Sequence, residues 1–170
     1  RVDWMEKGYH YSRRTKPHKY PDSVKESKLV EKAMKKPDKE YFLLSDESPR
    51  FPFFKYLDEA GLEHDKEEIN NIITDTYPVI IALKNYYNRP RPAQVNTNIK
   101  PYPSETAKTP AYPSGHALQA FVIAKHLSKK FPLRTLKFYS IAERIAKSRV
   151  SYGLHYPSDN DLSRKLANDF

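Results

Sequence analysis

Long stretches of helical periodicity constrain this chain more than any other feature. Over residues 66–88, 115–131 and 133–151, apolar side chains recur every three or four positions. This spacing places them on one face of an α-helix. No stretch shows the sustained alternation of a half-buried β-strand. We therefore expect an all-α fold, a single-domain helical bundle over residues 1–170, which is long enough to bury a real core.

Two of these apolar stripes contain a cation. Lys84 lies on the first stripe and Arg149 on the third. A buried cation without a partner is costly, so an anion is expected beside each of them. The stripes comprise Ile69, Ile72, Ile73, Ile80 and Lys84; then Ala117, Phe121, Ala124, Leu127 and Phe131; then Phe138, Ile141, Ile145 and Arg149.

Prolines, glycines and capping residues set the expected boundaries. Pro37 and Gly61 each end a helix, and Pro78 is expected to kink the helix that contains it. Ser158 is a plausible N-cap for the last helix. The expected elements are an extended arm over 1–22, a helix over 23–36, a loop over 37–53, a short helix over 54–60, a helix over 66–88, a long loop over 93–113, helices over 115–131 and 133–151, and a final helix from 158.

The composition excludes several classes of site and partner. The chain has no cysteine, which rules out disulfides, thiolate metal sites and cysteine nucleophiles. Its most apolar run, residues 77–83, is far shorter than the roughly 18 to 20 residues of a membrane helix, so a soluble protein is expected. The chain begins at Arg1 rather than Met, which leaves a cleaved signal peptide, and with it a periplasmic, secreted or cytoplasmic location, open.

The formal net charge of +9 favours anionic partners. Basic residues are frequent among residues 1–20, which could touch nucleic acid or simply keep the chain soluble. No nucleic-acid-binding motif accompanies them, so nucleic acid is not the expected partner.

Three motifs follow one another in the second half of the chain. The first is Lys84, six residues, then Arg91-Pro92; the second is Pro113-Ser114-Gly115-His116; the third is Ser148-Arg149, five residues, His155, three residues, Asp159. In residues and order they resemble the signature of the type 2 phosphatidic acid phosphatase superfamily, which includes the class A acid phosphatases and the vanadium haloperoxidases. The resemblance implies a helical bundle of that type, closest in character to the soluble class A-like acid phosphatases.

The residue types suit phosphoryl transfer. Three cations can hold phosphate oxygens, and arginine does so with two parallel hydrogen bonds. A serine hydroxyl and a glycine N–H at the start of a helix add donors where the helix dipole favours an anion. Such a site needs no metal ion, and none is expected. The expected phosphate-binding residues are Lys84, Arg91, Ser114, Gly115 and Arg149.

The resemblance makes His155 the nucleophile, which would form a phosphohistidine. Asp159 would accept the other ring N–H of that histidine and fix its tautomer. His116 would protonate the leaving oxygen and then activate water. The expected activity is hydrolysis of small phosphate monoesters, without a cofactor and with vanadate as an inhibitor.

Two other functions remain open at this point. One is a vanadium-dependent haloperoxidase, in which the same residues hold vanadate as a cofactor. The other is a non-catalytic protein that binds anions or nucleic acid, against which the two histidines argue. Binding alone requires neither His116 nor His155.

Several residues outside the motifs are assigned to the surface or to packing. Arg89 is expected at the surface, although it lies close enough to Arg91 to contact a leaving group. The sequence departs from common family usage after Asp159, where Leu162 and Ser163 replace an Ala-Gly pair, which bears on how tightly the last helix packs. The histidines expected at the surface or in packing are His10, His18, His64 and His126.

Overall fold

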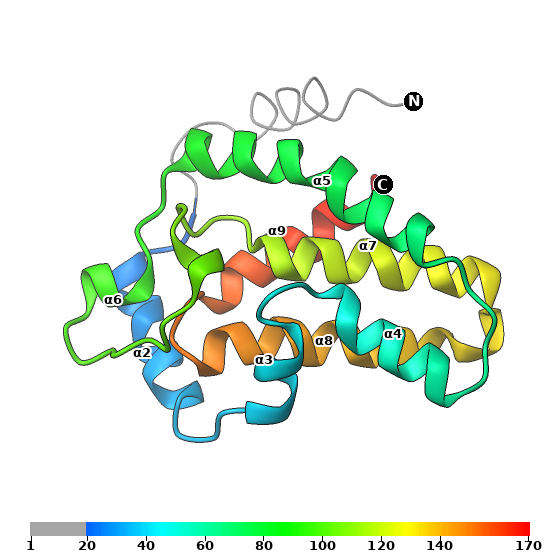
Figure 1. The fold of residues 1–170 in the computed structure, drawn as a ribbon. Coiled ribbons are helices and arrows are strands. Elements are labelled where there is room, and N and C mark those ends of the chain that lie inside the picture. Colours follow the sequence, from blue (N-terminus) through cyan, green and yellow to red (C-terminus); the bar gives the residue numbers. More distant parts are fainter. Residues whose placement is uncertain (1–19) are drawn as a thin grey trace.

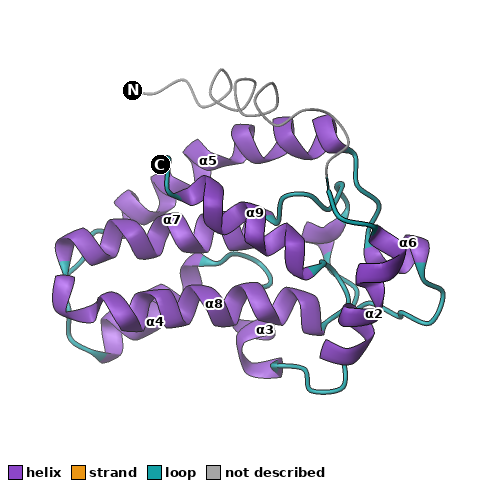
Figure 2. Cartoon of the chain, turned by 180° about the vertical axis from the view of Figure 1, so that it is seen from behind, coloured by secondary structure: helices purple, strands orange, loops and turns teal. Residues whose placement is uncertain are grey.

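The computed structural model describes residues 20–170, so most of the expected arm over 1–22 lies outside the described part. The described residues form helices and connecting loops, without a strand among them (Figures 1 and 2). The all-α expectation is therefore confirmed. The helices are α2 (Ser23–Ala33), α3 (Lys39–Ser45), α4 (Arg50–Glu59), α5 (Lys66–Tyr87), α6 (Pro92–Val95), α7 (Gly115–Lys130), α8 (Thr135–Ser151) and α9 (Pro157–Ala167), with 3-10 turns at Glu105–Ala107 and Pro132–Arg134.

Helix α7 lies at the centre of the fold. It packs against α8, α9 and α5, and Figure 1 shows α8 running alongside it with α5 crossing on the other side. Its residues from His116 to Ala124 are all buried, as expected for a helix covered on several faces. The predicted apolar stripe of α8 is also buried, with Phe138, Ile141 and Ile145 at most 1% exposed.

The N-terminal helices join this core at one end of the bundle. Helix α3 packs on α8, whereas α2 contacts α6, α8 and α9 (Figure 1). A second apolar cluster forms there, separate from the main core. It brings residues from both ends of the chain together: Val30, Ile99, Ala111, Val150 and Tyr156.

The expectation of a loop over residues 37–53 is wrong. Helix α3 occupies part of it, and α4 begins at Arg50 rather than at residue 54. Asp38 caps α3 by accepting a hydrogen bond from the backbone N–H of Tyr41 at 3.2 Å. Pro49 and Pro52 stand at the start of α4, where the first backbone N–H groups need no partner within the helix. These prolines therefore mark a helix start rather than a loop.

The last helix also begins differently from the prediction. Tyr156 is its N-cap and Ser158 lies in its first turn, so Ser158 is not the N-cap. Instead the backbone N–H of Ser158 donates to Glu26 Oε1 at 2.6 Å. Helix α5 continues through Pro78 and ends where predicted, with Asn88 in the left-handed region at φ 50°. The long loop expected over 93–113 includes most of the short helix α6, which begins at Pro92, and a 3-10 turn.

Candidate active site

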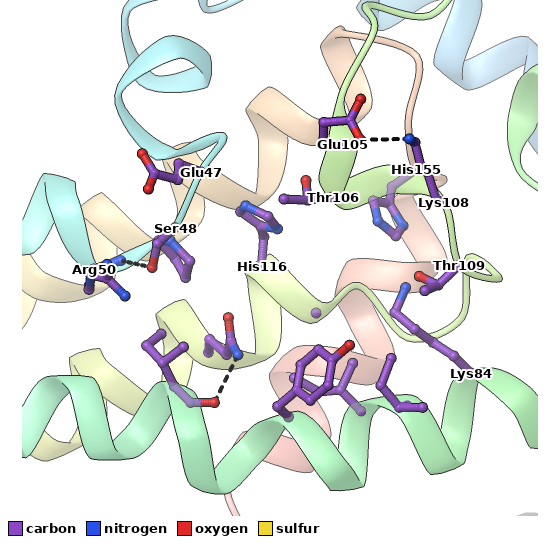
Figure 3. A pocket seen from close by; sticks show the side chains of 17 residues that line it. Glu47, Ser48, Arg50, Lys84, Glu105, Thr106, Lys108, Thr109, His116 and His155 are labelled. Atoms are coloured by element: carbon purple, nitrogen blue, oxygen red, sulfur yellow. Dashed lines mark hydrogen bonds and ion pairs between the residues drawn. The ribbon is translucent and has the colours of Figure 1, made fainter.

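Four of the predicted site residues line one cavity of about 430 Å³: Lys84, Gly115, His116 and His155. Figure 3 shows the three side chains among them around a common space. The arrangement follows from the fold, because the C-terminal ends of α5 and α8 meet the N-terminal ends of α7 and α9 (Figure 1). The motifs, far apart in the sequence, therefore reach one place.

His155 is held through both ring nitrogens. Its Nδ1 lies 2.8 Å from Asp159 Oδ2, and Arg91 Nη1 donates to its Nε2 at 2.9 Å. These partners assign the proton to Nδ1 and leave a lone pair on Nε2. Burial lowers the pKa of His155 well below its usual value, and the nearby cations Arg91 and Lys84 lower it further. The imidazole is therefore neutral near pH 7, and its Nε2 lone pair accepts the hydrogen bond from Arg91.

Asp159 is fully buried and accepts hydrogen bonds on both oxygens. Besides His155, Oδ2 accepts the backbone N–H of Tyr156 at 2.9 Å, and Oδ1 accepts Arg89 Nη1 at 2.8 Å. Burial raises the pKa of this carboxyl above its usual value, and Arg89 and the Tyr156 N–H offset only part of that rise. Because the neighbouring groups act as donors, we assign the ionised form.

Lys84, Arg91 and Arg149 form what we call the cationic cradle. Lys84 Nζ donates to the backbone oxygen of Pro110 at 2.7 Å, and Arg91 Nε donates to that of Thr109 at 2.7 Å. Burial is the main cause that lowers the pKa of each cation, to about 10 for Arg91. Several of their partners are thus neutral oxygens from the long loop.

Arg149 is the deepest member of the cradle. Its Nη1 donates to Asp46 Oδ1 at 2.7 Å and its Nη2 to Thr106 Oγ1 at 3.0 Å. Its Nε is buried and has no hydrogen-bond partner within residues 20–170. A buried donor of this kind calls for an acceptor, as the sequence predicts for a cation on an apolar stripe.

The start of α7 explains the serine and the glycine of the second motif. Ser114 is the N-cap, and its Oγ accepts the backbone N–H of Ala117 at 3.3 Å, which leaves its own proton to donate. A Cβ on Gly115 would stand 3.2 Å from Ile80 Cγ2. Glycine therefore allows the end of α5 to approach the start of α7 and brings Lys84 to the cavity.

His116 faces the cavity from the first turn of α7. Its Nε2 lies 2.9 Å from the backbone oxygen of Asp46, so this nitrogen carries the proton of the neutral ring. Burial lowers the pKa of His116 well below its usual value, with Arg149 as the next cause. The two histidines thus have different partners, a backbone carbonyl for His116 and a carboxylate for His155.

The assignment of Arg89 to the surface is wrong. Its side chain is fully buried and bonds to both Asp159 and Glu26. The sequence gives a weak signal, a second arginine inside Arg-Pro-Arg-Pro, but it does not show which carboxylates surround it. Asp46, Thr106 and Thr109 were not predicted either, because they contact the cradle only through the fold.

Ser163 fits where a glycine is common. It is fully buried, and its Oγ lies 2.7 Å from the backbone oxygen of Ser114 and 2.9 Å from that of Asp159. The hydroxyl thus joins the start of α7 to α9, which carries Asp159. The packing of the last helix is close despite the substitution.

Two further observations concern metal binding and membrane spanning. Within residues 20–170, no group of three or more histidine, aspartate or glutamate side chains is arranged to hold a metal ion. None of the helices in this part of the chain is long and apolar enough to span a bilayer.

Comparison with known proteins places these motifs in a family. A family model described as the PAP2 superfamily matches residues 69–164, more than half of the chain. The match includes every residue of the three motifs, from Lys84 to Asp159. No curated protein matches the chain.

Proposed function

This chain belongs to the PAP2 superfamily, whose members are generally phosphatases, and from that premise we propose that it hydrolyses small phosphate monoesters through a phosphohistidine on His155, without a metal ion. The observation that carries the proposal is the pairing of His155. A carboxylate holds Nδ1, while Nε2 keeps its lone pair beside the cationic cradle. This is the arrangement that a neutral nucleophile requires.

In the first step, the phosphate group of the ester lies in the cradle, and Nε2 of His155 attacks phosphorus. Arg91 moves its hydrogen bond from Nε2 to a phosphate oxygen, which frees the lone pair. The P–N bond forms as the P–O bond to the alcohol breaks. The imidazole keeps its proton on Nδ1 and gains positive charge, which Asp159 stabilises at 2.8 Å. Lys84 and Arg149 balance the charge on the transferring oxygens.

His116 acts as the general acid in the first step and as the general base in the second. An incoming phosphate ester adds negative charge beside this ring and raises its pKa, so binding favours the protonated form. His116 then gives a proton to the departing alkoxide. In the second step it takes a proton from water, which attacks phosphorus while the P–N bond breaks. Phosphate leaves, and His155 is neutral again.

A chromogenic phosphate ester tests the proposal. We expect turnover in the presence of EDTA, competitive inhibition by vanadate, and phosphate trapped on His155 after a quench without acid, since phosphohistidine is acid-labile. Complete loss of turnover in chelator, restored by magnesium or zinc, would refute the metal-independent mechanism. Phosphate found on a serine would refute the assignment of the nucleophile.

A further inference from the structure

Arg89 is a fully buried cation whose hydrogen bonds account for all five of its N–H groups. Its hydrogen-bond partners are two carboxylates, two serine hydroxyls and one backbone oxygen. The guanidinium fork is thereby saturated and held in one orientation. The bonds are Nε to Ser23 Oγ at 3.1 Å, Nη1 to Ser158 Oγ at 2.7 Å and to Asp159 Oδ1 at 2.8 Å, and Nη2 to the Pro21 oxygen at 3.1 Å and to Glu26 Oε2 at 2.9 Å.

Aromatic rings surround the same guanidinium. Its central carbon lies 3.8 Å from the ring centroid of Tyr156, 5.1 Å from that of Tyr20 and 5.6 Å from that of Tyr112. These contacts add cation–π attraction to the five hydrogen bonds. Another orientation of Arg89 would break these bonds inside a buried site, so Arg89 holds its partners in fixed positions.

Glu26 brings a second helix into this network. It lies on α2, outside the residues that the family model matches. Its Oε1 accepts the backbone N–H of Ser158 at 2.6 Å, and its Oε2 accepts both the hydroxyl of Ser158 and Arg89 Nη2. The first turn of α9, which carries Asp159, is thus tied to α2 through one carboxylate.

We propose that Arg89 and Glu26 are positioning residues for phosphoryl transfer, which fix Asp159 and through it the nucleophilic face of His155. The inference rests on the proposed function, and it makes α2 part of the working site. Neither residue touches the phosphate, because Asp159 and His155 stand between them and the cavity. Their effect is on orientation and charge.

The division of labour between the two oxygens of Asp159 supports this role. Oδ1 is bound to Arg89, while Oδ2 serves His155 and the backbone N–H of Tyr156. Rotation of the carboxylate would break both sets of bonds. The hydrogen bond from Arg89 to Oδ1 therefore fixes the position of Oδ2 relative to Nδ1 of His155. A small misplacement of a catalytic group can cost about 10²-fold in rate.

Charge supports the same role. Burial alone drives the Asp159 carboxyl toward its neutral form, and Arg89 opposes burial more than any other neighbour. Glu26 pairs with Nη2 and so keeps Nη1 directed at Asp159. The bond from Nη1 to Oδ1 favours the ionised form of Asp159, which stabilises the ring of His155 when it becomes positive.

A purely structural role is the alternative, in which Arg89 only joins α2 to the bundle. Arg144 provides the control, since it also joins two helices, α3 and α8, with a side chain that is 44% exposed where that of Arg89 is buried. It bonds to Asp38 with two nitrogens, at 3.0 and 3.1 Å, and stacks on Tyr41 at 3.7 Å, but it lies away from Asp159. Arg144→Met should lower stability and leave kcat unchanged.

The test measures kcat, the Ki of inorganic phosphate and melting temperature for Arg89→Met, Arg89→Lys, Glu26→Gln and Arg144→Met. We expect Arg89→Met to lower kcat about 100-fold. Arg89→Lys, which keeps the charge and loses the fork, should lower it about tenfold, and Glu26→Gln about threefold. The Ki of inorganic phosphate, a ground-state ligand, should stay within about threefold throughout, because Lys84, Arg91 and Arg149 are unchanged. If Arg89→Met does not fold, the other two variants carry the test.

A double-mutant cycle separates positioning from stability. If Arg89 acts through Asp159, then Arg89→Lys should lower kcat by less than about twofold once Asp159 is already asparagine. A full tenfold loss in that background would overturn the proposal. So would a wild-type kcat in folded Arg89→Lys and Glu26→Gln, or an equal loss of kcat in Arg144→Met.

Proton NMR provides a readout that does not depend on turnover. The Nδ1 proton of His155, assigned by its loss in His155→Asn, should resonate far downfield because of its bond to Asp159. The signal should shift or disappear in Arg89→Lys and persist in Arg144→Met. An unchanged signal in Arg89→Lys would overturn the proposal even if the chain proved not to be a phosphatase, and an inactive wild type with the expected shifts would refute only the proposed function.

Discussion

The two sides of the site are built in opposite ways. Behind His155 lies a back wall, made of Glu26, Arg89 and Asp159, in which a cation meets two carboxylates and each of the three is at least 91% buried. Around His116 lies a rim, made of Asp46 and Thr106, where Asp46 is 26% exposed in its side chain and Thr106 is exposed. Both sides contain ion pairs, but those of the back wall are buried, whereas the rim pair of Asp46 and Arg149 has a partly exposed carboxylate. The comparison shows that the buried side holds its groups in fixed orientations, whereas the open side is the one that solvent can reach.

The largest effect should come from the residue that the back wall holds. His155→Ala removes the attacking atom, so kcat should fall by about 10⁴-fold or more. The helical circular dichroism spectrum should be unchanged, because the pair of Asp159 and Arg89 remains. Asp159→Asn should be milder, since it alters orientation and leaves Nε2 in place. Near-normal turnover in His155→Ala would show that His155, the residue held by the back wall, is not the nucleophile.

The role of His116 at the rim can be tested by comparing phosphate esters with different leaving groups. An alkyl alkoxide departs poorly without a proton, whereas nitrophenolate leaves as an anion. His116→Asn should therefore slow alkyl phosphate hydrolysis by about 10²- to 10⁴-fold and formation of the phosphoenzyme from a nitrophenyl ester far less. A burst of nitrophenol should appear, since water activation is lost as well. His126→Asn, at the partly exposed far end of α7, is the control. Equal losses for both esters without a burst would contradict general acid catalysis by His116.

The pH profile of kcat/KM should depend on both His155 and His116. His155 must be neutral, so kcat/KM falls when pH drops below its pKa; His116 must be protonated, so kcat/KM falls when pH rises above its pKa. Burial lowers both pKa values well below 6.5. The maximum should therefore lie on the acid side of pH 6.5, with limbs that change about tenfold per pH unit. His116→Asn should lose the alkaline limb, and a wild-type maximum above pH 7.5 would contradict the assignment.

The smallest effect should come from Asp46, which competes with a phosphate for Arg149. Its side chain is partly exposed, so the ion pair contributes about 1 kcal/mol. Asp46→Asn should therefore bind vanadate about fivefold more tightly. Asp161→Asn, which removes an exposed partner of Arg164, should leave the Ki unchanged. Weaker binding in Asp46→Asn would mean that this carboxylate holds Arg149 in position instead of competing for it.

Periodicity predicts the long helices of this fold and fails on the short ones. Helices α5, α7 and α8 carry enough turns for an apolar stripe to be recognised, and their boundaries fall within two residues of the prediction. Helices α3 and α4 depend on the cap at Asp38, on prolines at a helix start and on packing against α8. Short helices are stabilised mainly by such tertiary contacts, which a local pattern does not contain.

The candidate site shows the same limit. The motifs name the residues that meet the cavity or stand directly behind it, and the roles assigned to them remain predictions. The partners of Arg89 could not be foreseen, because Glu26 and Asp159 are separated by more than half of the chain and meet only when α2 packs on α9. The residues next to Arg89 in the sequence do not indicate whether its side chain faces solvent or two carboxylates.

The backbone oxygens of Thr109 and Pro110 bear on product release. Arg91 and Lys84 already donate to them, and Arg149 donates to the hydroxyl of Thr106. A phosphate that takes one of these donors therefore replaces a bond that the protein makes with itself, whereas the buried Nε of Arg149 has no partner to lose within residues 20–170. If the site hydrolyses phosphate esters as proposed, the loop oxygens can return to Arg91 and Lys84 when phosphate departs. The long proline-rich loop would then limit the affinity of the site for phosphate.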